Sequence, residues 1–243
     1  MAEQAETLRR TPLSRDRILR AAIALADLAG IESLSMRNLA QDLGVVPMAL
    51  YKHVANKDEL LDGMIDVVVG EIDPPVPDAD WKPAIRRRVL SAREVLRRHP
   101  WAPLAIESRN MATPAILAYL DSMVATFRAG GLSADLAHHV MHAMGSRILG
   151  FSQELFDASR SAGRSGTTNP DPPAGFPPEV AARFPHLAEI ATAASHDDHS
   201  VVGQGCDDRF EFEFALDLLL DGIERLQRQG WTSSRRPAER RDA

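Results

Sequence analysis

Positions 51–53 read Tyr-Lys-His, and Lys57 follows about one helical turn later. A phenol hydroxyl, an ammonium group and an imidazole can each donate a hydrogen bond to a phosphate oxygen. Met48 and Ala49, just before them, can offer apolar contact to a thymine methyl group. We therefore expect this segment to bind double-stranded DNA. The formal net charge of -6 does not exclude a local basic face, because nucleic-acid binding depends on where the cations lie.

Four short helices are predicted to position these residues. The first begins after Ser14 and ends at Gly30, and the second extends from Ser35 to Gly44. The third covers Pro47 to His53, with proline tolerated in its first turn. The fourth begins at Asn56, which with Glu59 forms a capping box, and extends to about position 72. Two short helices across a tight glycine turn form a helix-turn-helix, and the second has the size of a major-groove helix.

Spacing within the third helix assigns its faces. Leu50 and Val54 are four residues apart, so both are expected to point into a small core. Their partners in that core are expected to be Leu25, Leu39 and Leu43. Ile18, Ala22, Leu25 and Leu28 recur at helical spacing in the first helix. The outward side of the third helix is then formed by Pro47, Met48, Tyr51 and Lys52.

The proline-rich segment "DPPVPDAD" at positions 73–80 predicts a stiff linker. Further helices are expected at about 81–98, 100–109, 113–130, 133–157, 179–194 and 209–229, with a long mobile loop at 158–178. No strand pattern or repeat is evident. The predicted fold is all-α, with an N-terminal helix-turn-helix domain at 14–73 and a helical ligand-binding and dimerisation domain at 81–230.

Several functional classes find no support in the sequence. Cys206 is the only cysteine, which excludes an intramolecular disulfide and a cysteine-based zinc site. The N-terminus has no apolar core of a signal peptide, and no apolar run is long enough to span a membrane, so a cytoplasmic protein is expected. Phosphate-binding loops and nucleophile motifs are missing as well. We predict neither catalytic residues nor a cofactor.

Histidines and arginines form three further clusters. His138 and His142 lie one helical turn apart and could hold a metal, but no third ligand is apparent, so a helix facing a pocket or a dimer seam is favoured. The loop residues 196–199, His-Asp-Asp-His, are interpreted as solvated. Arg86, Arg87 and Arg88 are interpreted as a solvated face, with the alternative that one of them pairs with an acidic helix end. A metal-dependent enzyme built on the histidines is the rival function for these clusters.

An effector pocket is predicted among the central helices of the second domain. Its candidate lining residues combine aromatic, methionine and histidine side chains, and core packing explains most of them equally well. They are Trp101, Met111, Met123, Phe127, His142 and Met144.

The segments "AGIESLSMRNLAQDLGV" and "LYKHVANKDELL", with their spacing, resemble the DNA-binding domain of the TetR family of bacterial repressors over residues 14–66. The resemblance implies phosphate or base contacts from Ser35 and Arg37 and phosphate contacts from Tyr51, His53 and Lys57. Base reading is implied for Pro47, Met48, Ala49 and Lys52. The tetracycline repressor carries Gln, Pro, Thr and Trp in those four places, so the operator is expected to differ.

Residues 81–228 resemble the C-terminal domain of the tetracycline-repressor-like subtype through "RHPW", "AGGLSADLA", "ILGFSQE" and "RFEFEFALDLLLDGIERL". The resemblance implies that the helix at 133–157 and the last helix pair with those of a second subunit. It also places a magnesium-binding histidine near Ile106 or Glu107, where no histidine stands. Glu154 matches a carboxylate of that site. Tetracycline is therefore not expected as the ligand.

Together these features predict a homodimeric repressor that binds a near-palindromic operator and releases it when a small-molecule effector binds. The effector, the operator sequence and the regulated genes are not identified. Two alternatives stay open: a transcriptional activator with the same DNA-binding domain, and a small-molecule-binding helical protein whose helix-turn-helix no longer binds DNA.

Overall fold

The computed structural model describes residues 12–76, 80–150, 178–186, 188–189 and 208–235, and these are helical with connecting turns. The all-α prediction is confirmed. The helices are α2 (Arg15–Ala29), η1 (Ile31–Ser33), α3 (Met36–Asp42), α4 (Pro47–Leu50), α5 (Lys57–Val69), α6 (Trp81–Arg98), α7 (Ala102–Glu107), α8 (Pro114–Ala129), α9 (Ala134–Gly150), α11 (Pro178–Arg183), α13 (Asp208–Arg228) and η2 (Ser233–Arg235).

Predicted caps begin three of the N-terminal helices. The Ser14 hydroxyl accepts a hydrogen bond from the backbone N–H of Arg17, and the Ser35 hydroxyl accepts one from that of Asn38. Asn56 accepts from the backbone N–H of Glu59 at 2.8 Å. Each contact satisfies a backbone donor that a helix start leaves without a partner. These N-cap residues therefore set where α2, α3 and α5 begin.

The third predicted helix is shorter than expected. α4 ends at Leu50, and residues 51–53 form a turn rather than a continuation of the helix. The backbone N–H groups of His53 and Val54 both donate to the Leu50 carbonyl oxygen, at 2.8 and 3.0 Å. That convergence closes the helix and leaves room for Asn56 to cap α5. Tyr51, Lys52 and His53 therefore follow the helix instead of belonging to it.

One hydrophobic core joins α2–α5 to the following helices. It contains Leu39, Leu50 and Val54, each at most 1% exposed, as their spacing predicts. Leu25 and Leu43 are partly buried against it. Leu28, which recurs at helical spacing with Ile18, Ala22 and Leu25, is 88% exposed and lies outside this core. The core also takes in Val95, Trp101, Ala102 and Ala105, so packing does not stop at the proline-rich segment.

The antiparallel pair α6 and α8 carries its own packing contacts. The rings of Trp81 and Phe127 lie with centroids 5.8 Å apart, and the guanidinium carbon of Arg88 lies 4.8 Å from the ring centroid of Tyr119. Gly130 ends α8 directly against Trp81. A Cβ atom at Gly130 would stand 2.3 Å from Trp81 Cδ1, so only glycine permits this approach.

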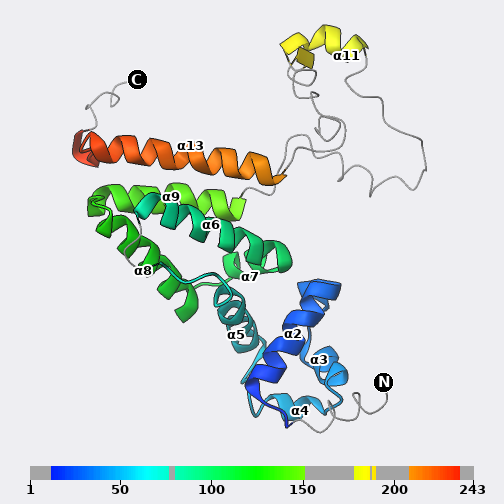
Figure 1. Cartoon of the computed structure of the whole chain (residues 1–243). Helices are drawn as coiled ribbons and strands as arrows, with labels where there is room; N and C mark the ends of the chain where they lie inside the picture. The colour runs from blue at the N-terminus through cyan, green and yellow to red at the C-terminus, as the bar shows by residue number, and fades with distance from the viewer. Residues whose placement is uncertain (1–11, 77–79, 151–177, 187, 190–207, 236–243) are drawn as a thin grey trace, which may run out of the picture. The chain divides into compact units, whose positions relative to one another are not determined.

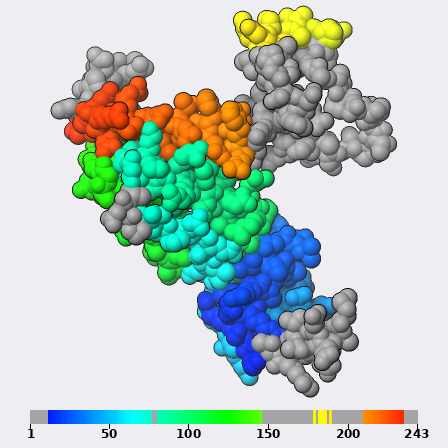
Figure 2. Space-filling view, viewed as in Figure 1, coloured from blue at the N-terminus to red at the C-terminus, as the bar shows by residue number. Residues whose placement is uncertain are grey.

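Figure 1 shows α2, α3 and α4 grouped together, with α5 leading from them to α6–α8. In the space-filling view the blue N-terminal helices adjoin the cyan and green segments that follow (Figure 2). Contacts divide the chain into two compact units, Met1–Met141 with Trp231–Ala243, and His142–Gly230. The predicted domain limits of 14–73 and 81–230 stay a prediction.

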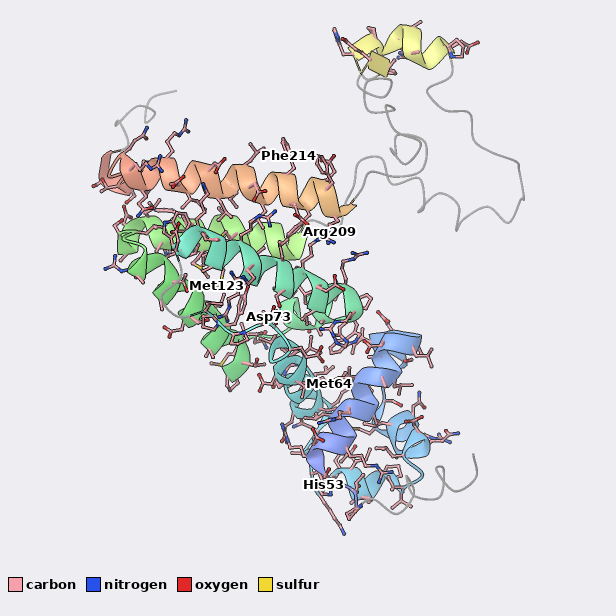
Figure 3. All side chains as sticks on the ribbon, in the orientation of Figure 1. His53, Met64, Asp73, Met123, Arg209 and Phe214 are labelled. Carbon is pink, nitrogen blue, oxygen red and sulfur yellow. The ribbon has the colours of Figure 1, made fainter. Side chains whose placement is uncertain are left out.

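The second unit contains all of α13, whose apolar residues lie on two faces. Phe212, Leu216, Leu220 and Ile223 are at most 5% exposed. Phe210, Phe214 and Leu218 are between 53% and 62% exposed, and the two phenylalanine rings stack at 6.3 Å. Figure 3 labels Phe214 on this helix. The predicted loop at 158–178, the loop residues 196–199, Glu154 and Cys206 lie outside the described residues, apart from position 178 at the start of α11.

Candidate nucleic-acid interface

The candidate interface is the outward side of α4 and the turn after it. Met48 is 71% exposed and Tyr51 is 43% exposed, whereas Leu50 between them is fully buried. Pro47 and Lys52 are exposed, and Ala49 and His53 are partly exposed. The segment thus buries one side in the core and leaves the side with apolar and donor groups to solvent. Those groups have the chemistry required to contact base edges and phosphates.

Ser35 and Arg37 lie at the start of α3. The Ser35 hydroxyl caps that helix, so its role in the described structure is local, and its own O–H stays available as a donor. Arg37 is exposed two residues later. Lys57 is the first residue of α5 and is also exposed. A helix N-terminus with a lysine is a favourable environment for a phosphate. The predicted contact residues that the structure describes are therefore all at least partly accessible.

An arginine from beyond α7 contacts the acidic side of α5. Arg109 Nη1 donates to Asp58 at 2.9 Å, and Arg109 Nη2 donates to Asp62 at 3.2 Å, while Nε lies 2.7 Å from the other Asp62 oxygen. The pKa of Arg109 is raised, mainly by its hydrogen bond to Asp58 and further by its bond to Asp62. Burial lowers this pKa, but by less than the bonds raise it. One turn further, Asp66 accepts a hydrogen bond from the backbone N–H of Ala115 at 3.1 Å.

Asp58, Asp62 and Asp66 are spaced by four residues, so they form one stripe along α5. This stripe faces Arg109 and the start of α8, whereas Lys57 begins the same helix beside the candidate interface. Figure 3 labels Met64 on α5 between His53 and Asp73. α5 therefore connects the candidate interface physically to the helices after residue 80.

A second connection is a polar cluster around Asp27 at the end of α2. Trp101 donates its indole N–H to Asp27 at 2.7 Å, and His99 Nδ1 lies 2.9 Å from the same oxygen. The other ring nitrogen of His99 lies 3.4 Å from Glu71, which pairs with Arg98 at 2.9 Å. His99 and Trp101 are buried, at 8% and 4% exposure. The cluster ties α2 to the segment between α6 and α7.

Two family models match the chain. The description "Bacterial regulatory proteins, tetR family" matches residues 18–64, and "Tetracyclin repressor-like, C-terminal domain" matches residues 73–227, more than half of the chain. The chain belongs to the TetR family. The helix-turn-helix of this TetR-family regulator thus coincides with the first matched region.

Similar proteins agree with this placement. The chain is 29% identical over 227 residues to the HTH-type transcriptional repressor DrrR1 of Streptomyces coeruleorubidus, covering 90% of this chain and 80% of that protein. Apo ActR from Streptomyces coelicolor has the same fold, with a TM-score of 0.66 at 24% identity over 91% of this chain and 99% of that one. ActR in complex with actinorhodin gives a TM-score of 0.63 at 26% identity, over 88% and 98% of the two chains.

The predicted effector-pocket residues of this TetR-family chain occupy different environments. Met123 and Phe127 on α8 and Met144 on α9 are at most 1% exposed, as pocket or core residues would be. Met111 is 83% exposed, and His142 is exposed. Trp101 is buried in the core shared with the N-terminal helices, and its indole N–H donates a hydrogen bond to Asp27. These contacts hold α2 against the later helices. The effector pocket predicted from these six residues stays a prediction.

The other clusters are resolved in part. His138 and His142 are both exposed on α9, and within the described residues no three histidine, cysteine or acidic side chains gather as a metal site. The helices that the structure describes include none that is long and apolar enough to cross a membrane.

The interpretation of Arg86, Arg87 and Arg88 as a solvated face is wrong for Arg88. Arg87 is exposed, but Arg88 is only 8% exposed and belongs to the buried side of α6. The run gave no sign of this, because three consecutive arginines occupy three different directions on a helix. The spacing of Trp81, Ile85, Arg88 and Ala92 is the signal that could have found it.

Proposed function

We propose that this chain is a ligand-responsive transcriptional repressor that binds a near-palindromic operator as a homodimer in the cytoplasm. The DNA-binding region is residues 14–73 and the regulatory region is residues 81–230. The observation that carries the proposal is that residues 47–54 bury one side of the segment in the core and expose the other side to solvent. Leu50 and Val54 are at most 1% exposed, whereas Met48 on α4 is 71% exposed. The similar protein DrrR1 is named a transcriptional repressor, which supports the direction of control.

Within this proposal the contact residues have separate tasks. Tyr51, His53 and Lys57 bind phosphates and set the register of the protein on the duplex, and Ser35 and Arg37 add contacts from the start of α3. Met48, Ala49 and Lys52, preceded by Pro47, discriminate between bases. Phosphate contacts contribute affinity without sequence information, whereas each good base contact contributes about 1–3 kcal/mol of discrimination.

The decisive experiment measures binding of the purified protein to the DNA upstream of its own gene by fluorescence anisotropy at several salt concentrations. Lys57→Ala is expected to weaken binding about equally for all sequences and to reduce the salt slope by about one unit. Lys52→Ala is expected to relax specificity at one base pair. Lys82→Ala on α6 is the control and should change neither. No binding by the wild-type protein at low salt would refute the proposal.

Homodimer formation is proposed through the exposed side of α13. Phe210, Phe214 and Leu218 recur every four residues and are more than half exposed, which is unusual for large apolar groups on a helix that faces only water. Phe214→Asp is expected to shift the protein toward monomer in analytical ultracentrifugation and to lower operator affinity. Leu28→Asp places the same charge at an apolar residue of α2 that is even more exposed, 88% against 53% for Phe214. It is the control and should leave the dimer intact. A monomeric wild-type protein would contradict this part.

Ligand response is proposed by analogy with ActR, whose structure in complex with actinorhodin is similar to this chain. The contacts of α5 with Arg109 and Ala115 offer a route by which a change among the later helices moves Lys57. A coupling free energy of about 1–3 kcal/mol suffices to change operator affinity about 5–150-fold.

A further inference from the structure

Arg88 is a buried cation without an anion in the described structure. It lies on α6 among Ile85, Val89 and Ala92, which are also buried. Its Nε and Nη1 atoms are inaccessible to solvent and have no hydrogen-bond partner, and no ion pair of Arg88 occurs among the described residues. An arginine side chain stays protonated in proteins, so this is a buried charge, which is unfavourable unless it is paired.

Tyr119 on α8 faces the same point. The guanidinium carbon of Arg88 lies over the Tyr119 ring at 4.8 Å from the centroid, and this cation–π contact supplies no hydrogen-bond acceptor for Nε and Nη1. The Tyr119 hydroxyl is itself buried without a hydrogen-bond partner among the described residues. Burial raises the pKa of Tyr119 to about 12, so the hydroxyl is a neutral donor. Two unpaired donors therefore stand together.

The surroundings of the pair are apolar. Trp81 contacts Phe127, and Arg88, later on α6, contacts Tyr119, which is earlier on α8. The two helices are therefore antiparallel. Ile85 on α6 and Met123 on α8 fall between these two contacts, and both are buried. An acceptor that pairs with Arg88 would thus carry its charge beside hydrocarbon and aromatic side chains. A simple inorganic ion would leave its remaining oxygens without partners there.

We propose that Arg88 and Tyr119 bind the carboxylate of the effector, and that the effector is therefore an apolar organic acid. The proposal rests on the proposed ligand-responsive function and specifies the ligand class. A carboxylate accepts a charge-assisted hydrogen bond from the guanidinium and a second one from the Tyr119 hydroxyl, which supplies the missing partners. Its apolar part lies against the buried side chains of α6 and α8.

The first test needs no ligand. Arg88→Met removes the charge and keeps a long side chain, whereas Arg87→Met makes the same change at the neighbouring exposed position. If Arg88 is unpaired in the free protein, the urea midpoint of Arg88→Met is equal to or higher than that of the wild type. A midpoint lower than that of Arg87→Met would show that Arg88 already has a stabilising partner in the folded protein, and the proposal would be overturned.

The second test measures binding by isothermal titration calorimetry. The probes are benzoate, 2-naphthoate and anthracene-2-carboxylate, each compared with its uncharged primary amide of nearly the same shape. At least one acid is expected to bind about tenfold tighter than its amide, which corresponds to ~1.4 kcal/mol. Arg88→Met should abolish that preference, Tyr119→Phe should reduce it, and Arg87→Met should retain it. Equal binding or non-binding of acid and amide in all three pairs, or an acid preference that survives in Arg88→Met, would overturn the proposal.

The same variants separate this proposal from the repressor function. Wild type and Arg88→Met are expected to bind operator DNA equally in the absence of a probe, since Arg88 lies outside the predicted DNA contacts. Loss of operator binding by the wild type would count against the repressor function alone. An acid that binds through Arg88 without releasing DNA would support the carboxylate site and refute induction through it.

Discussion

Asp27→Ala removes the acceptor that joins α2 to the segment between α6 and α7. The substitution leaves the Trp101 indole N–H, now bonded at 2.7 Å, and the His99 Nδ1 contact, now 2.9 Å, without their partner. Both rings are buried, at 4% and 8% exposure, so water replaces the lost carboxylate poorly. A hydrogen bond to a charged group contributes about 1.5–3 kcal/mol to stability.

The Asp27 side chain is 29% exposed, so solvent screens part of these interactions. Two bonds at the lower end of the range then predict a loss of about 2–3 kcal/mol in the free energy of unfolding. With a urea m-value of about 1–3 kcal/mol/M, the midpoint should fall by roughly 1 M or more. Urea denaturation followed by circular dichroism and tryptophan fluorescence measures it, and Trp101 reports directly on the altered contact.

Asp16→Ala is the matched control in the same helix. Among the described residues Asp16 forms an ion pair with Arg20 alone, at 3.0 Å. The two side chains are 66% and 75% exposed, so the loss on substitution should stay below about 1 kcal/mol. If Asp27→Ala is no more destabilising than Asp16→Ala, the cluster does not tie the helices together, and the reasoning from burial is wrong. Asp27→Asn, which keeps an acceptor for the indole, should lose about half as much as Asp27→Ala.

Three further outcomes are expected. Gly130→Ala should destabilise the protein by roughly 1–3 kcal/mol in thermal unfolding, because its Cβ would stand 2.3 Å from Trp81 Cδ1. The Tyr119 hydroxyl should ionise near pH 12. Tyrosinate absorbance at 295 nm measures this, and the part of the signal that is missing in Tyr119→Phe belongs to Tyr119. Since burial raises this pKa above the unfolded value of 10.0, the stability it contributes is present below about pH 10 and is lost as the pH rises toward 12. Arg109→Ala should lower operator affinity without changing base preference in anisotropy titrations, because it frees Asp62 and the helix that begins at Lys57.

Local signals made most of the N-terminal region predictable. Ser14, Ser35 and Asn56 each cap a helix by accepting a hydrogen bond from the backbone amide three residues later, so both partners lie within one short stretch of sequence. The inward direction of Leu50 and Val54 follows from their spacing alone. The length of α4 was not predictable in this way, because it depends on two backbone amides sharing the Leu50 carbonyl oxygen.

Contacts between distant segments defeated the sequence reasoning. Trp101 looked like a pocket residue, but its partner Asp27 lies 74 residues away in the chain. Arg88 was interpreted as solvated because its neighbours are arginines, although its spacing with Trp81, Ile85 and Ala92 places it on the buried side of α6. Arg109 and its acidic partners on α5 were not singled out at all, since the pairs are 47 and 51 residues apart and no periodic pattern joins them.

The alternation of burial along residues 47–54 also bears on how such a protein changes over time. Leu50 and Val54 hold the segment in place, while Met48 and Lys52 contribute nothing to the core. If these residues read bases as proposed, substitutions at the outward positions would alter the preferred DNA sequence with little loss of folding stability. On the same proposal, exchanging the outward residues together would redirect the protein to another operator while Leu50 and Val54 keep the scaffold unchanged.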